Sequence, residues 1–396
     1  MASLTSWTHP RWSRLAAGTA LALAVAAAAA GCTSSPATTT NTSKNTSAPA
    51  LTTAQARGIF NAYAATTAEA ARTQDSALAL SVVTGVQRGI LAATLKFGTS
   101  LCSAPPSGGS AFSGSGCFSG EPAYYRYAYG APDIYLPEQA GYPRFFLADA
   151  MLTLKGAALG KGMTTWTGPA GVTVPIDGRA LMVFEQASAS AAWQLASVSR
   201  FPSGMALPRL AMDANGYVPQ VPLTATALLA RPDVTGPLQA AVVDDGPASS
   251  AAKAVAAGPL TTGMYQAART HVEGLTAPRG DVYQWELEGT RFPAFALRTA
   301  SGGALVLYAM YLNSTVAVPD VINKANHVRP GLPIAVPPIF LPMVPTDKIA
   351  PRESLETQEL LSFAGIDPPA AAAGTAGSAR VTVIAIGGGP NYATAS

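Results

Sequence analysis

The order of the predicted elements constrains the fold of this chain most strongly. Apolar residues recur at near-helical spacing after Leu51, where Thr52 or Thr53 can cap a helix, and a second helical stretch over 76–95 is interrupted near Gly85. Strand patterns follow, separated by Gly, Pro and Ser clusters. They cover residues 124–129, 144–148, 180–185 and 192–198. Helices grouped before strands favour an α+β fold with antiparallel sheets over an alternating α/β fold.

The same order recurs further along the chain. Two helices are predicted within residues 246–274. Strands are predicted over 281–289, 292–298, 304–314 and 379–386. A Pro-rich connection between Val316 and Pro369 contains a predicted short helix over 354–363. Because a chain of this length usually divides, we expect two tandem helix-then-antiparallel-sheet domains, the first over residues 51–230 and the second, with the Pro-rich excursion, over 231–396.

An uncharged apolar run precedes these domains. It follows Arg11 and Arg14 and ends at Cys32. The run is short for a membrane span of about 20 residues, and the segment after it is rich in Thr and Ser rather than basic. An uncleaved N-terminal anchor and an ordinary signal peptide are the alternatives to a cleaved leader that ends before Cys32.

This leader resembles a bacterial lipoprotein signal peptide over residues 1–31. Residues 29–32 take the place of the lipobox, with Ala29 where lipoboxes usually have Leu. The resemblance implies that Cys32 is lipidated, for example with palmitate, as the first residue of the mature chain. Residues 32–50 then form the lipidated Cys and a flexible Thr/Ser-rich linker.

Composition and charge narrow the class of protein. Hydrophobic residues make up 48% of the chain and charged residues only 12%, so the chain can bury a sizeable core. The 25 basic residues nearly balance the 22 acidic ones. Because nucleic-acid binding needs a concentrated basic face, we expect no nucleic acid as a partner.

Two further cysteines lie in a segment rich in Gly, Ser and Pro. Cys102 and Cys117 predict a disulfide bond if the chain folds in an oxidising compartment. Closing a loop of about 15 residues stabilises a fold by roughly 3 kcal/mol. A zinc site is the alternative, but two thiols with no nearby His make a poor ligand set. We therefore expect neither a metal nor another cofactor.

The chain has few of the residue patterns that mark catalytic sites. Only His271 and His327 remain after the leader, and no Gly-x-Ser-x-Gly motif occurs. Ser250 and Lys253 match a Ser-x-x-Lys pair, but the Lys-Thr-Gly partner motif is absent. Residues 213–216 could supply oxygens to calcium, although Asn-Gly favours a tight turn. We therefore expect no catalytic residues and no enzymatic activity.

Aromatic side chains are dense between residues 124 and 146. Tyrosine and phenylalanine at the edge of a curved sheet suit lipid or glycan ligands. The candidate ligand-binding residues are Tyr125, Tyr127, Tyr129, Tyr142 and Phe145, with Tyr135 in the same region. The alternative, which we favour, is that these residues form the core of the first sheet and its solvent-exposed edge.

Several segments of the chain resemble one known family. They are residues 51–56, 141–148, 192–195, 207–217 and 380–385. In this order they are similar to landmarks of an actinobacterial envelope lipoprotein family built on a domain of unknown function. The resemblance implies an envelope lipoprotein with no assigned reaction and no catalytic residues.

The sequence thus leads to one expected function and two alternatives. We expect a lipid-anchored protein on the extracytoplasmic face of the cell membrane that binds a small apolar ligand or an envelope protein. One alternative is a cell-wall hydrolase using carboxylates such as Asp244, Asp245 or Glu273. The other is a structural spacer.

Overall fold

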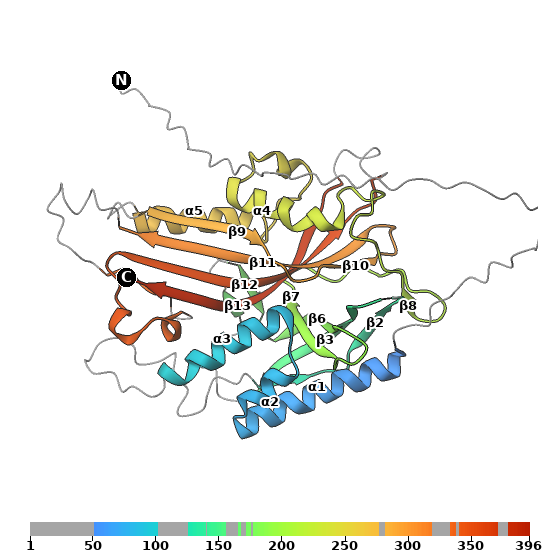
Figure 1. Ribbon diagram of the computed structural model, residues 1–396. Coiled ribbons are helices and arrows are strands. Elements are labelled where there is room, and N and C mark those ends of the chain that lie inside the picture. Colours follow the sequence, from blue (N-terminus) through green and yellow to red (C-terminus); the bar gives the residue numbers. More distant parts are fainter. Residues whose placement is uncertain are drawn as a thin grey trace, which may run out of the picture. The chain divides into compact units, whose positions relative to one another are not determined.

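The computed structural model of the chain contains one large, mostly antiparallel sheet with helices packed against it (Figure 1). The structure describes residues 51–101, 126–139, 141–155, 165–167, 172–175, 177–276, 282–318, 333–337, 340–370 and 379–396. The described residues all belong to one compact unit. The predicted signal peptide, Cys32 and nearly all of the predicted linker lie outside the described residues.

The N-terminal helices match the sequence prediction. They are α1 (Thr53–Thr73), α2 (Ser76–Ser81) and α3 (Gly85–Leu101). Thr52 caps α1, because its hydroxyl accepts a hydrogen bond from the Gln55 amide at 3.3 Å and the Gln55 side chain accepts one from the Thr52 amide at 2.7 Å. This reciprocal pair is a capping box, which satisfies two amides that a helix start otherwise leaves unpaired.

Strands from the first half of the chain follow these helices. They are β1 (Arg126–Tyr129), β2 (Asp133–Pro137), β3 (Arg144–Lys155), β6 (Gly178–Gln186), β7 (Gln194–Arg200) and β8 (Tyr217–Val218). A separate two-stranded sheet consists of β4 (Thr165–Thr167) and β5 (Thr173–Pro175). The strand positions predicted within this half are confirmed, with boundaries shifted by a few residues.

The second half again begins with helices. Its α-helices are α4 (Thr235–Asp245) and α5 (Thr262–Thr276). Its short 3₁₀ helices are η1 (Pro232–Val234), η2 (Ser250–Lys253), η3 (Leu341–Met343) and η4 (Thr346–Lys348). Its strands are β9 (Val282–Gly289), β10 (Phe295–Arg298), β11 (Ala304–Ala317), β12 (Ser354–Asp367) and β13 (Thr382–Ala395).

Two predictions for this half are wrong. Of the two helices expected within residues 246–274, only α5 and the short η2 lie there, because α4 ends at Asp245. Residues 354–363, expected to form a short helix, belong to the long strand β12. This strand lies between β11 and β13, and its residues 359–365 are buried on both faces. A strand buried on both faces has a continuous apolar run instead of alternation, so its pattern is not distinct from that of a buried helix.

The two halves share one connectivity. In the first half, β1 and β2 both pair with β3, and β6 and β7 follow beside it. In the second half, β9 and β10 both pair with β11, and β12 and β13 follow. Because β7 pairs with β13, both halves belong to a single 11-stranded sheet. The recurring element order is therefore present, but the separation into two domains near residue 230 is not shown.

Each half covers one face of its strands with two of its own helices, whereas α3 of the first half also packs against β12 and β13 of the second half. In the first half, Phe146 and Phe184 pack with Phe60 of α1. In the second half, Val306 and Phe363 share a core with side chains of α4 and α5. Figure 1 accordingly shows α1 and α2 on one side of the strands and α4 and α5 on the other.

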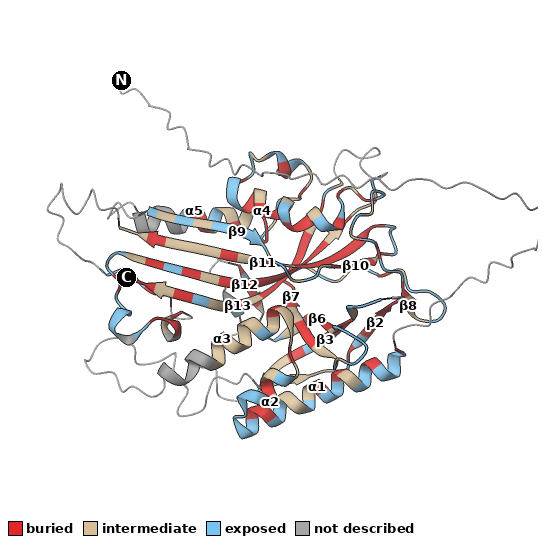
Figure 2. Cartoon of the chain, in the orientation of Figure 1, coloured by how far each residue is buried: buried red, intermediate tan, exposed pale blue. Residues whose placement is uncertain are grey.

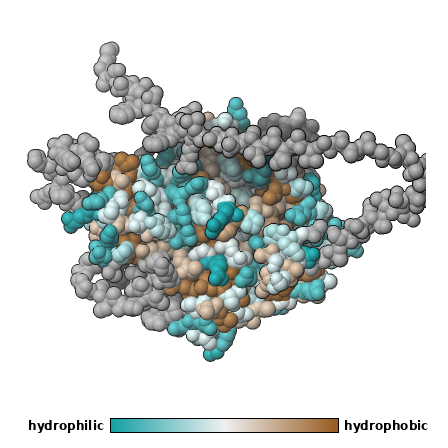
Figure 3. All heavy atoms as spheres, in the orientation of Figure 1, coloured by the Kyte–Doolittle hydropathy of each residue, from teal (hydrophilic) through white to brown (hydrophobic). Residues whose placement is uncertain are grey.

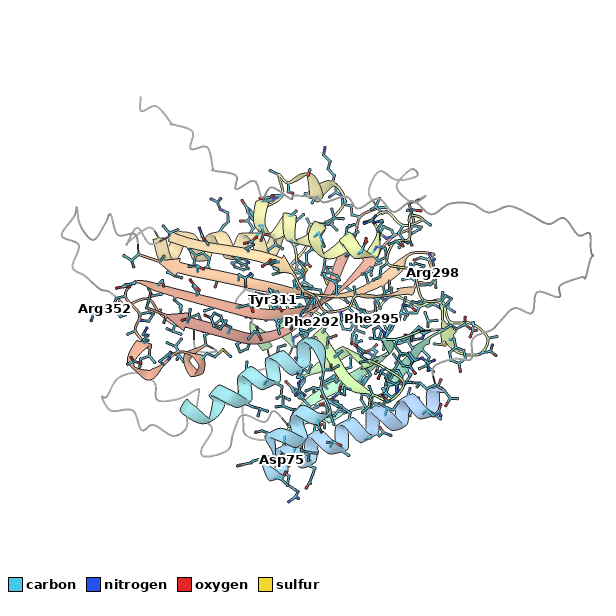
Figure 4. The ribbon with its side chains drawn as sticks, in the orientation of Figure 1. Asp75, Phe292, Phe295, Arg298, Tyr311 and Arg352 are labelled. Carbon is cyan, nitrogen blue, oxygen red and sulfur yellow. The ribbon has the colours of Figure 1, made fainter. Side chains whose placement is uncertain are left out.

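The opposite faces of the two halves pack against each other. Phe145 of β3 stacks on Phe295 of β10, with ring centroids 4.2 Å apart. Figure 4 labels Phe295 in this contact region. The same cluster contains Leu147, Leu181, Leu305 and Leu307. Burial is accordingly concentrated in the strands, whereas the outer side of α1 is exposed (Figure 2). The resulting order of layers is α1 and α2, first-half strands, second-half strands, and α4 and α5, with α3 packed beside β7 and β13 (Figure 1).

A close contact joins β13 to β7. A Cβ atom at Gly387 would collide with the carbonyl oxygen of Val198. The same carbonyl accepts a hydrogen bond from the Ser362 hydroxyl at 2.8 Å, and Ser362 accepts one from the Ser199 hydroxyl at 3.0 Å. Both serines are buried, so each hydroxyl needs the partner it has.

We predict that Gly387→Ala lowers the free energy of unfolding by about 3 kcal/mol, because the added methyl group forces β13 away from β7. Thermal or denaturant unfolding followed by circular dichroism measures this change. The matched control is Gly289→Ala in β9, where no atom lies within 4 Å of the added Cβ. Its effect is expected to stay within about 1 kcal/mol. Equal stability of the two variants would show that the close contact is not required.

Candidate functional site

Two of the predicted ligand-binding residues lie together beneath α1. The Tyr129 ring centroid is 5.8 Å from those of Phe60 and Tyr63, and the Tyr129 hydroxyl donates a hydrogen bond to that of Tyr63 at 3.5 Å. Tyr127 lies beside Tyr129, and the guanidinium carbon of Arg200 is 5.1 Å from the Tyr127 ring centroid. This group is part of the first-half core, as the favoured alternative expects.

The other predicted residues lie elsewhere. Phe145 is buried on the opposite face of the sheet, between the two halves. Tyr142 is 42% exposed, and the Arg144 guanidinium stacks 4.7 Å above its ring. Tyr125 lies outside the described residues. The four described residues therefore do not converge on one cavity.

A hollow of about 570 Å³ lies at the edge of the first-half strands. It is lined by Tyr135 of β2, Asp149 of β3, Arg179 of β6, Pro175, Gly178 and the segment 200–209. We call it the Tyr135 pocket. Small-molecule sites usually measure about 300–1,000 Å³, so its size suits a small ligand. Of its lining residues, only Tyr135 belongs to the aromatic group predicted as a ligand site from the sequence.

An ion-pair network forms the polar wall of the Tyr135 pocket. Arg179 Nε donates to Asp149 Oδ1 at 3.0 Å, and Arg179 Nη2 donates to Asp149 Oδ2 at 2.6 Å. The same Nη2 donates to Asp133 Oδ2 at 2.7 Å. The Asp149 side chain is only 4% exposed, whereas that of Arg179 is 48% exposed. Arg179 therefore compensates a carboxylate that water hardly reaches.

The pKa shifts in this wall have physical causes. Burial raises the pKa of Asp149, although hydrogen bonds from Arg179 oppose this effect. Hydrogen bonds to Asp149 and Asp133 raise the pKa of Arg179. Burial, followed by the charges of Asp149 and Asp133, raises the pKa of Tyr135. Tyr135 thus keeps its proton at neutral pH and can donate a hydrogen bond to a ligand.

The opposite wall is a loop between β7 and β8. Phe201, Met205 and Leu207 of this loop pack into the core between the halves. The loop is attached to the second half, because the Ala211 amide donates to the Arg298 carbonyl at 2.9 Å and the Ala300 amide donates to the Arg209 carbonyl at 2.8 Å. Arg298 lies at the end of β10 (Figure 4). The pocket thus has one wall from first-half strands and one wall attached to the second half.

The remaining sequence motifs lie outside the Tyr135 pocket. Ser250 and Lys253 lie exposed on the single-turn helix η2. The Asp213 carboxylate accepts hydrogen bonds from the amides of Asn215 and Tyr217, each at 2.8 Å. Gly216 has a φ of 86°, so the predicted turn is confirmed there.

The carboxylates proposed for a hydrolase do not come together at one site in the described part of the chain. Asp244 Oδ1 accepts a hydrogen bond from the Leu287 amide at 3.0 Å and thereby joins α4 to β9. Desolvation of this carboxylate raises the pKa of Asp244 to about 6, although the residue as a whole is exposed. Asp245 is also exposed. The side chain of Glu273 and the residues Cys102 and Cys117 lie outside the described parts of the chain.

A buried carboxyl group lies away from the Tyr135 pocket. Glu359 of β12 is 2% exposed, and its Oε2 has no hydrogen-bond partner among the described residues. Burial raises the pKa of Glu359 to about 8. At neutral pH the group is therefore mostly protonated, which avoids the large cost of an unpaired buried charge.

The described part of the chain presents a face of mixed hydropathy in Figure 3 and lacks a grouped set of metal-ligand side chains. On the face drawn in Figure 3, apolar residues gather in patches that hydrophilic residues separate. Within the described ranges, no three His, Cys, Asp or Glu side chains are grouped to hold a metal ion. The helices in those ranges include none that is long and apolar enough to cross a membrane.

We predict that Arg179→Gln lowers the free energy of unfolding by about 2 kcal/mol at neutral pH. Asp149 then stays buried without its cation, and the value is below that of a fully buried pair because Arg179 is half exposed. The matched control is Arg231→Gln, whose exposed pair with Asp233 is expected to contribute less than about 1 kcal/mol. Denaturant unfolding of both variants measures the difference. Equal losses would contradict a special role for the Asp149 pair.

Comparison with known proteins identifies the family but not a reaction. No curated protein and no solved structure matches the chain. A family model described as a domain of unknown function, DUF8094, matches residues 115–330, which is more than half of the chain. The match includes all of the Tyr135 pocket. The chain therefore belongs to the DUF8094 family.

Proposed function

We propose that this protein binds a small ligand in the Tyr135 pocket, without catalysing a reaction, at the extracytoplasmic face of the cell membrane. The observation that carries the proposal is the pocket itself, a hollow of about 570 Å³ with one polar and one apolar wall. Ligand sites usually combine an apolar lining with a few placed polar groups. This pocket has that composition.

The chemistry of the polar wall supports binding rather than catalysis. Asp149 in the lining and Asp133 beside it both accept hydrogen bonds from Arg179. A general base needs a carboxylate that can take a proton from a substrate, and the strong pairing with Arg179 opposes that role. We do not favour a hydrolase centred on Asp244, because its carboxylate is engaged with the Leu287 amide.

The proposed location rests on the N-terminal sequence. The apolar run ends at Cys32 after a small-residue site, and a Thr/Ser-rich segment separates Cys32 from the start of α1. Lipidation at Cys32 would attach the protein to the membrane, and a linker of this composition would keep the folded body free to meet its ligand. An envelope partner protein remains compatible with this location.

We predict that Cys32→Ala abolishes membrane anchoring. Wild-type protein is expected to partition into the detergent phase of a Triton X-114 extraction, because two or more acyl chains anchor a protein stably. The variant is expected to stay in the aqueous phase or to retain its leader, which intact-mass measurement detects. Equal partitioning of both proteins would contradict the lipoprotein proposal.

We predict that protein purified from native membranes carries a small molecule in the Tyr135 pocket. Ala206 lies exposed in the pocket lining, so Ala206→Trp adds an indole ring there and is expected to reduce the bound amount roughly tenfold. Mass spectrometry of extracted small molecules measures the molar ratio. The control is Ala54→Trp on the exposed side of α1. Equal ligand content in both variants would exclude the pocket as the binding site.

A further inference from the structure

We propose that the ligand of the Tyr135 pocket is amphipathic, with an uncharged, hydroxyl-bearing head group and an apolar part. This inference rests on the proposed ligand-binding function and adds the chemical class of the ligand. It follows from three properties of the lining: its charge balance, its unused hydrogen-bonding groups and the composition of its loop wall.

The charges around the pocket cancel. Asp149 and Arg179 lie in the lining, Asp133 is bonded to Arg179, and Arg209 is an exposed residue of the loop wall. The pocket thus has two carboxylates and two guanidinium groups at its walls. A fully charged ligand would meet repulsion from one pair as well as attraction from the other, so neither an anion nor a cation is favoured overall.

Arg200 does not change this balance, although it is also part of the lining. Its strand partner is Ala180, which faces the core beneath α1. Its guanidinium carbon is 5.1 Å from the Tyr127 ring centroid on that same side of the sheet. The charge of Arg200 is therefore directed away from the face that carries Asp149 and Arg179.

The polar wall offers unused donors and acceptors. Among the described residues, Arg179 Nη1 and Asp133 Oδ1 have no hydrogen-bond partner, and the Asp133 side chain is 65% exposed. The Tyr135 hydroxyl can both donate and accept. Hydroxyl groups match this mixture, because each of them can donate to a carboxylate and accept from a guanidinium or a phenol.

The loop wall suits the apolar part of the ligand. Its side chains include Phe201, Pro202, Met205, Leu207 and Pro208. Burying apolar surface against such a wall contributes affinity without requiring charge. A ligand with hydroxyl groups at one end and hydrocarbon at the other would therefore satisfy both walls at once.

Three probes with the same tail and different heads test the inference. Octyl glucoside, octyl sulfate and octyltrimethylammonium are titrated below their micelle concentrations into the purified protein by isothermal titration calorimetry. We expect octyl glucoside to bind at least about tenfold more tightly than either ionic probe. We expect Tyr135→Phe to weaken that binding, whereas Tyr392→Phe, at an exposed position on β13, leaves it unchanged.

The other outcomes separate the two proposals. If an ionic probe binds as tightly as octyl glucoside and Ala206→Trp abolishes its binding, the head-group class is wrong and the pocket remains the ligand site. Both proposals are overturned by two results together: none of the three probes binds, and Ala206→Trp does not reduce the ligand content of membrane-purified protein. Circular dichroism melting of each variant verifies that a lost signal does not come from unfolding.

Discussion

Strand β13 approaches β7 so closely that a residue with a side chain does not fit at Gly387, and this contact unites the two halves of the chain. The buried hydroxyls of Ser199 and Ser362 complete the junction by hydrogen bonding at Val198. Once the strands are joined, the inner faces of both halves cover each other through contacts such as Phe145 on Phe295. Without this contact, the apolar inner face of each half would be exposed and would need another layer of structure to cover it.

The Tyr135 pocket depends on this junction. Its polar wall comes from β2, β3 and β6, whereas its loop wall is hydrogen-bonded to β10 and the residues after it. The buried Asp149 is tolerated because Arg179 pairs with it from the neighbouring strand. The pocket is therefore a product of long-range packing, and a ligand in it would contact residues from separate parts of the chain.

Local sequence patterns predicted the positions of helices, strands and turns better than they predicted how the strands join into one sheet. The cap at Thr52 and the turn at Gly216 depend on neighbouring residues, so they could be predicted. The helical prediction for 354–363 failed because central strands lose the alternation that marks a strand. The single sheet depends on contacts between residues nearly 190 positions apart, such as Val198 and Gly387, which no local pattern reveals.

The candidate site was harder to predict for the same reason. Tyr129 was a candidate because aromatic residues are dense in that part of the sequence. Such density is equally typical of a hydrophobic core, and Tyr129 lies in one. A better signal was Asp149, a lone charge within the apolar run of β3, because a buried carboxylate requires a partner. That partner, Arg179, is 30 residues away and becomes visible only once β3 and β6 are paired.

The central claim is that a ligand occupies the hollow between first-half strands and the loop attached to the second half. Hydrogen exchange followed by mass spectrometry, with and without saturating octyl glucoside, tests it most directly. The account predicts slower exchange in residues 201–209 and 133–137, with little change in α5. Slower exchange confined to other segments, or no change despite saturation, would contradict it.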